Sequence, residues 1–139
     1  LIRDQLSLIC PSDDPLALRE QVAWADLAGS RIITVRAGAH NTHGIRNLVD
    51  QALARSGVQL SLAYQVSLFT TALALCHQGL GRAVLPAFLL SFTSHPRLVA
   101  RPLVEPVITR DICLLRKADT PLTPAAQAFA ELLRAELGD

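Results

Sequence analysis

Two stretches of the chain place polar residues where a helix is expected to follow a strand. A predicted strand at Arg31–Arg36 leads into a loop of small residues, 37–42, and a second strand at Val58–Val66 leads to Ser67. The first N–H groups of a helix have no backbone partner, and partial positive charge gathers there, so helix starts attract anions. Arg36 adds a guanidinium fork that suits a carboxylate. The pattern predicts a site for a small anion.

Ser67 also has a purely structural interpretation. Its hydroxyl can accept a backbone N–H of the first turn and cap the helix predicted over Leu68–Gln78. In the same way, Asn41 or Thr42 can cap the helix expected over His43–Ser56. Capping and ligand binding do not exclude each other, because a cap hydroxyl can also face a cleft.

Patterns for catalysis or metal binding are weak. His40 and His43 have the spacing of two metal ligands, but no Cys, Asp or Glu completes a set nearby. Ser67 lacks the G-x-S-x-G elbow of a nucleophile. Gly79-x-Gly81 closes a predicted helix, whereas the dinucleotide fingerprint opens one. We therefore expect no catalytic residue, no metal and no cofactor, and the sequence favours a binding protein over an enzyme.

The composition limits the kinds of partner that the chain can bind directly. The net charge is +1, from 13 basic and 12 acidic residues, and the longest basic run is Arg116-Lys117. This argues against direct nucleic-acid binding, which needs a basic footprint. The longest apolar runs fall short of the roughly 18 residues needed to span a membrane. Three dispersed cysteines without C-x-x-C predict buried free thiols in a reducing compartment, at Cys10, Cys76 and Cys113.

The elements that would position the anion site form an α/β pattern. Tyr64–Pro86 reads as strand, helix, glycine and strand, with Gly79 suited to the left-handed position that ends a helix. Pro102 favours an edge or crossing position for its strand, and Thr123 caps a last helix whose first residue is Pro124. We expect strands at 5–10, 31–36, 58–66, 80–85, 98–104 and 110–116, helices at 43–56, 68–78 and 123–137, and helical turns at 24–27 and 86–90.

The stretch V-S-L-F-T-T-A-L-A-L-C-H-Q-G-L-G-R-A-V-L-P, residues 66–86, resembles the signature of the effector-binding domain of LysR-type transcriptional regulators. Leu6–Ala17, Trp24–Val35 and the last third of the chain are similar to other segments of that family, in the same order. At a turn where the family has His-Pro-Leu-Ala, this chain has Asp14 in place of the histidine. The resemblance implies an α/β, periplasmic-binding-protein-like (type 2) clamshell, whose two subdomains are joined by two crossing strands.

The resemblance also implies a division of the chain. Residues 11–102 would form a nearly complete subdomain II, whereas residues 1–10 and 103–139 would be a remnant of subdomain I. The chain begins Leu-Ile-Arg and contains no Met, so we expect it to be a fragment. Part of the sheet beneath the last helix would then be missing. This predicts that an apolar stripe is exposed or covered by another chain, at Phe129, Leu132, Leu133 and Leu137.

Family resemblance further implies a binding site and partners. The turn Ser67–Thr70 and the strand end Val35–Ala37 would line an effector cleft, with Phe69 and Pro86 as apolar walls. The parent protein would be a cytoplasmic homodimer or homotetramer, with helix 43–56 at the dimer contact, and would reach DNA only through an N-terminal winged helix-turn-helix absent from this chain. The effector-binding residues expected are Ser67, Phe69, Thr70, Arg36, Ala37, His40 and Pro86.

A solute-binding protein or an enzyme of the same clamshell fold is the alternative, because fold does not fix function. The residues that precede Leu1 in the parent protein would discriminate. A basic helix-turn-helix there would indicate a regulator, and a leader with an apolar core would indicate a secreted binding protein.

Overall fold

The computed structural model describes residues 1–36, 44–92 and 95–137. It divides into two compact units, a larger one of Gln5–Ile108 and a smaller one that combines Leu1–Asp4 with the chain from Thr109 onward. The assignment of residues 11–102 to subdomain II, and of 1–10 with 103–139 to subdomain I, stays a prediction.

A mixed β-sheet forms the larger unit, with strand order β2-β6-β1-β5-β3-β4. The parallel centre that the sequence predicts is confirmed, because β3 runs parallel to both β4 and β5. β1 is antiparallel to β5 and to β6. The strands are β1 (Ile2–Pro11), β2 (Val22–Ala23), β3 (Arg31–Val35), β4 (Ser61–Val66), β5 (Arg82–Pro86) and β6 (Leu98–Val104).

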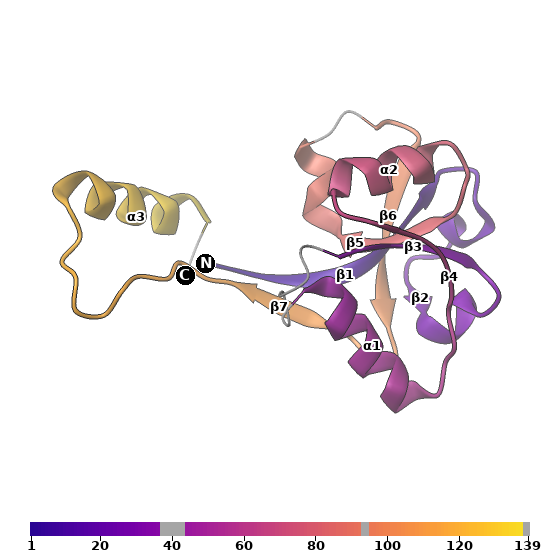
Figure 1. Ribbon diagram of the computed structural model, residues 1–139. Helices are drawn as coiled ribbons and strands as arrows, with labels where there is room; N and C mark the ends of the chain where they lie inside the picture. The colour runs from indigo at the N-terminus through magenta and orange to yellow at the C-terminus, as the bar shows by residue number, and fades with distance from the viewer. Residues whose placement is uncertain (37–43, 93–94, 138–139) are drawn as a thin grey trace. The chain divides into compact units, whose positions relative to one another are not determined.

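Two helices, α1 (Ile45–Ser56) and α2 (Phe69–His77), cover opposite faces of this sheet (Figure 1). Because successive side chains of a strand point to opposite faces, Ile32 and Ile33 enter different cores. Ile32 packs in the core that contains α1, and Ile33 packs in the core that contains α2. Short 3₁₀ turns complete the unit at Pro15–Leu18, Trp24–Leu27 and Ala87–Phe92.

The ends of α1 and α2 follow the sequence, but their starts do not. Gly57 and Gly79 end α1 and α2 with φ of 70° and 72°, as predicted. The N-cap of α2 is Leu68, without a side-chain cap, so the prediction that Ser67 caps this helix is wrong. The Arg36 N–H donates to the Val66 carbonyl at 2.9 Å, which keeps the chain extended to the end of β4. Leu68 is still extended, with φ of −118° and ψ of 138°, so the helix begins one residue later than predicted.

The start of α1 differs in the same way. Its N-cap is Gly44, again without a side-chain hydrogen bond, so capping by Asn41 or Thr42 is also a wrong prediction. Asn41 and Thr42 themselves lie outside the described residues. The helix begins at Ile45 rather than His43.

Two strands differ from the predicted pattern. β6 lies between β1 and β2, so of the predicted edge or crossing position the edge is excluded. Pro102 is tolerated there because β2 pairs only with Leu103 and Val104, leaving Pro102 beside β1 alone. The last strand, β7 (Thr109–Ile112), is shorter than the predicted 110–116, since its partner β1 begins at Ile2.

The smaller unit holds the first residues of β1, β7 and the helix α3 (Pro124–Leu137). The Ala126 N–H donates to Thr123 Oγ1 at 3.3 Å, which confirms the predicted cap. Phe129 and Leu132 are 58% and 57% exposed, and Leu137 is 43% exposed. The predicted exposure of the apolar stripe is therefore confirmed, except that Leu133 is half-buried.

Candidate functional site

The parallel strands β3 and β4 end at the same edge of the sheet, and there the structure brings together two of the predicted site residues. Val35 pairs with Val66 in the sheet register. Arg36 and Ser67, the next residue of each strand, are both exposed. The backbone hydrogen bond from Arg36 to Val66 fixes this juxtaposition. A guanidinium and a hydroxyl thus share one edge, in reach of solvent.

The start of α2 lies beside them and is uncapped. The first helical bond of α2 runs from the Ala72 N–H to the Leu68 carbonyl at 3.2 Å. The N–H groups of Phe69, Thr70 and Thr71 precede it, and no side-chain cap accepts from them. Within the described part of the chain, the Ser67 hydroxyl makes no hydrogen bond either. This helix start can therefore take an anion without displacing an internal partner.

The other predicted site residues differ in how exposed they are. Thr70 is exposed on the first turn of α2, and Phe69 is half-buried between the two cores, where it anchors the helix start. Pro86 is buried and pairs with Leu6, so it offers no exposed wall. Ala37 and His40 lie outside the described residues. The role of each residue in effector binding stays a prediction.

Thiol chemistry is not available in the core. Burial raises the pKa of Cys10 to about 12 and that of Cys76 to about 11. The Cys76 thiol donates to the Ile9 carbonyl at 3.2 Å. Cys113 is exposed, so the prediction of buried thiols holds for two cysteines and is wrong for the third. Among the described residues no group of three metal-ligating side chains forms, and no helix is long and apolar enough to cross a bilayer.

An ion pair that sequence reasoning missed lies where β3 and β5 begin, at the opposite ends of these strands. The Arg82 guanidinium donates to Asp14 through Nε at 2.8 Å and through Nη2 at 3.0 Å. Its Nη1 donates to Ser30 Oγ at 2.6 Å. These groups line a cavity of about 290 Å³ together with Gly29 and Gly81. The signal available in the sequence is Asp14 itself, an acidic residue in the turn at 11–15.

The environment of Asp14 explains its charge. Burial pushes the pKa of Asp14 upward, but the hydrogen bonds from Arg82 and from the Leu16 N–H outweigh it and hold that pKa below its ordinary value. Both partners of the Arg82–Asp14 pair are thus charged and hydrogen-bonded to each other. The pair fixes the turn after β1 against the start of β5, so its role is structural.

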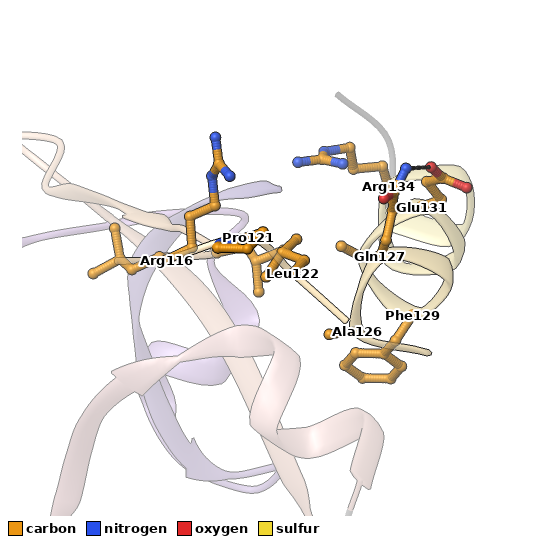
Figure 2. A pocket seen from close by; sticks show the side chains of 11 residues that line it. Arg116, Pro121, Leu122, Ala126, Gln127, Phe129, Glu131 and Arg134 are labelled. Atoms are coloured by element: carbon orange, nitrogen blue, oxygen red, sulfur yellow. Dashed lines mark hydrogen bonds between the residues drawn. The ribbon is translucent and has the colours of Figure 1, made fainter. Parts of the chain in front are cut away.

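A larger cavity, of about 650 Å³, lies within the smaller unit. It is formed between α3 and the segment that leads to it, and Arg134 extends from α3 on the same side as Arg116 and Leu122 (Figure 2). Leu115, which also lines it, is 87% exposed. The apolar lining continues the exposed stripe of α3.

Comparison with known proteins gives the family. The family described as the LysR substrate binding domain matches residues 1–138. The chain belongs to this LysR family. It is 36% identical, over 133 residues, to the uncharacterized HTH-type transcriptional regulator YbhD of Escherichia coli K12, covering 96% of this chain and 41% of that protein. Over 134 residues it is 28% identical to the HTH-type transcriptional regulator YfeR of Shigella flexneri, covering 96% of the chain and 42% of that relative. The LysR chain therefore spans about two fifths of the length of these curated relatives.

Solved structures show the same fold. A putative LysR family regulator from Pseudomonas aeruginosa matches with a TM-score of 0.79 at 18% identity, over 100% of this chain and 47% of that one. The regulatory domain of CcmR from Synechocystis PCC6803, in complex with 2-PG, matches with a TM-score of 0.77 at 19% identity, over 99% and 65%. The effector-binding domain of QuiR in complex with shikimate matches with a TM-score of 0.67 at 19% identity, over 99% and 63%. The expected periplasmic-binding-protein-like type 2 fold is thus confirmed.

Proposed function

We propose that this chain is the effector-sensing part of a bacterial LysR-type transcriptional regulator, and that it binds a small anionic metabolite at the edge defined by Arg36, Ser67 and the start of α2. The observation that carries this proposal is the helix start without a side-chain cap, whose N–H groups lie beside an exposed guanidinium and a hydroxyl that has no hydrogen-bond partner among the described residues. Shikimate, the ligand of one structural neighbour, is a carboxylate, which is the chemistry this edge favours.

Other properties of the parent protein follow from the same proposal. The chain would bind its effector without catalysis, in the cytoplasm, and would act as part of a homodimer or homotetramer. DNA would be contacted by a separate domain, since the relatives carry HTH-type regulator names and are more than twice as long as the part matched here. These names favour a regulator over the alternative of a solute-binding protein or an enzyme with the same clamshell fold.

We also propose that α3 and its neighbours belong to subdomain I, as the division at 1–10, 11–102 and 103–139 implies. This chain covers only 65% and 63% of the CcmR and QuiR domains. The remaining third of such a domain is the natural cover for the apolar face of α3, which is exposed in this chain.

Binding of carboxylates tests the proposed site. We expect Ser67→Ala to weaken binding of a carboxylate such as shikimate by roughly fivefold, the factor that corresponds to the loss of about one hydrogen bond. Arg36→Gln should weaken it further, because a charge-assisted contact is lost. Calorimetry on a version of the protein that includes both subdomains measures this effect.

Ser61→Ala is the matched control, because Ser61 is exposed at the opposite end of β4. It should leave the affinity unchanged. Equal affinities for the Ser67 and Ser61 variants, with both folded, would remove Ser67 from the site. If no carboxylate or phosphate binds the unmodified protein, the anionic effector class itself is wrong.

A further inference from the structure

The chain passes between its two units only twice, at Asp4–Gln5 and at Ile108–Thr109. Both passages are joined on the side of the larger unit, where the Leu6 N–H donates to the Ile108 carbonyl at 3.0 Å. Any change in one unit that reaches the other through the covalent chain must cross these two points. The contacts that hold these two points therefore affect how such a change is transmitted.

Trp24 holds the second passage from within the larger unit. Its side chain is fully buried in the core that faces α1, and its indole Nε1–H donates to the Pro106 carbonyl at 2.9 Å. Pro106 lies in the turn between β6 and β7, next to Glu105, whose φ of 61° is unusual for a residue other than glycine. Such a backbone conformation persists where surrounding contacts hold it. Ile108 packs into the same core as Trp24.

Gln5 holds the first passage. It is the first residue of the larger unit, and its side-chain Nε2 donates to the Leu103 carbonyl at 2.8 Å. Leu103 lies near the end of β6, just before the second passage. Two side-chain hydrogen bonds, from residues far apart in the sequence, thus converge on the segment 103–108. Neither bond is needed to form the sheet, because backbone pairing already joins β6 to β1 and β2.

We propose that Trp24 and Gln5 form a brace that keeps both passages of the chain rigid in the ligand-free domain. Its regulatory meaning rests on the proposed function, since an effector would have to work against this brace to change the passages. Trp24 and Gln5 are then positioning residues, which touch no ligand.

Hydrogen exchange of the ligand-free chain tests the brace without any effector, so it is independent of the proposed binding site. Trp24→Phe keeps an aromatic ring but removes the donor to Pro106. We expect amide exchange at Leu6 and across residues 103–109 to accelerate by roughly fivefold, as for the loss of about one hydrogen bond. Exchange in β3, β4 and β5 should stay as in the unmodified chain. Gln5→Leu should accelerate the same region, and it decides the question if Trp24→Phe does not fold.

Tyr64→Phe is the matched control. It removes another side-chain hydrogen bond of the larger unit, between Arg31 and the Tyr64 hydroxyl at 2.9 Å, on the far strands of the sheet. It should leave exchange across residues 103–109 unchanged. Unaltered exchange there in the Gln5 and Trp24 variants would overturn the proposal. Acceleration by the same factor throughout Gln5–Ile108 would overturn it as well, because it would show a general loss of stability.

Discussion

At the residue scale, the Arg82–Asp14 pair shows how one side chain in the turn after β1 can stabilise the fold. Asp14 has 13% of its side chain exposed and Arg82 has 25%. Both side chains are part-buried, and replacing Asp14 leaves the Arg82 charge without this partner. We expect Asp14→Asn to lower the free energy of unfolding at neutral pH by roughly 2 kcal/mol, as for the loss of hydrogen bonds between charged groups. Urea unfolding measures this change.

The same pair predicts an acid dependence. Because the folded-state pKa of Asp14 lies below its ordinary value of 3.8, the pair stabilises the fold fully above that pH. The stabilisation is lost as the pH falls through the lowered pKa. The difference between the unmodified chain and Asp14→Asn should therefore shrink as the pH falls below about 4. Asp13→Asn, at an exposed neighbouring position, should show no comparable loss at neutral pH. A pH-independent difference would contradict the assignment.

At the element scale, Gly57 gives a clean test of helix termination. Its φ is 70°, and a Cβ added there would meet no atom within 4 Å. The cost of a side chain is therefore a backbone cost alone. We expect Gly57→Ala to lower the free energy of unfolding by about 1 kcal/mol. Gly57→Asn should cost less, because asparagine tolerates the left-handed conformation. Equal losses for both variants in urea unfolding would show that φ is not the cause.

The ends of α1 and α2 were predictable and their starts were not, for a physical reason. A glycine at a left-handed position is required by its own backbone, so Gly57 and Gly79 carry the signal locally. The start of α2 instead depends on where β4 stops pairing with β3, which is a contact between distant segments. Ser67, a favoured cap by type, was therefore assigned to the wrong position.

Strand positions show the same division. The bounds of β6 agree with the predicted 98–104, whereas its interior place depends on the two-residue strand β2, which is too short to carry a pattern. At the candidate site, the sequence indicated the strand ends that meet, Arg36 and Ser67. It did not indicate the burial of Pro86, or the pairing of Asp14 with Arg82 across 68 positions of the chain. The residue pattern predicted an anion site at these strand ends, and the family resemblance added the expectation that they line an effector cleft.

At the scale of the whole molecule, the exposed apolar face of α3 determines whether the isolated chain associates with itself. Phe129, Leu132 and Leu137 are exposed along one side of the helix. An exposed apolar surface of this kind marks a contact site. We expect the isolated chain to associate with itself at micromolar concentration and to bind a fluorescent apolar dye.

Introducing charge on that face tests the cause. The double variant Phe129→Lys, Leu132→Lys should shift the chain toward the monomer in sedimentation experiments and reduce dye binding several-fold. Its free energy of unfolding should change by no more than about 0.5 kcal/mol, because both side chains are already exposed. Ala135→Lys adds a charge at another exposed position of α3 and should leave association unchanged. If both variants associate like the unmodified chain, the α3 face is not the contact. In the longer protein, where we propose that subdomain I covers this face, the same double variant should instead destabilise the fold, because the two lysines would then be buried.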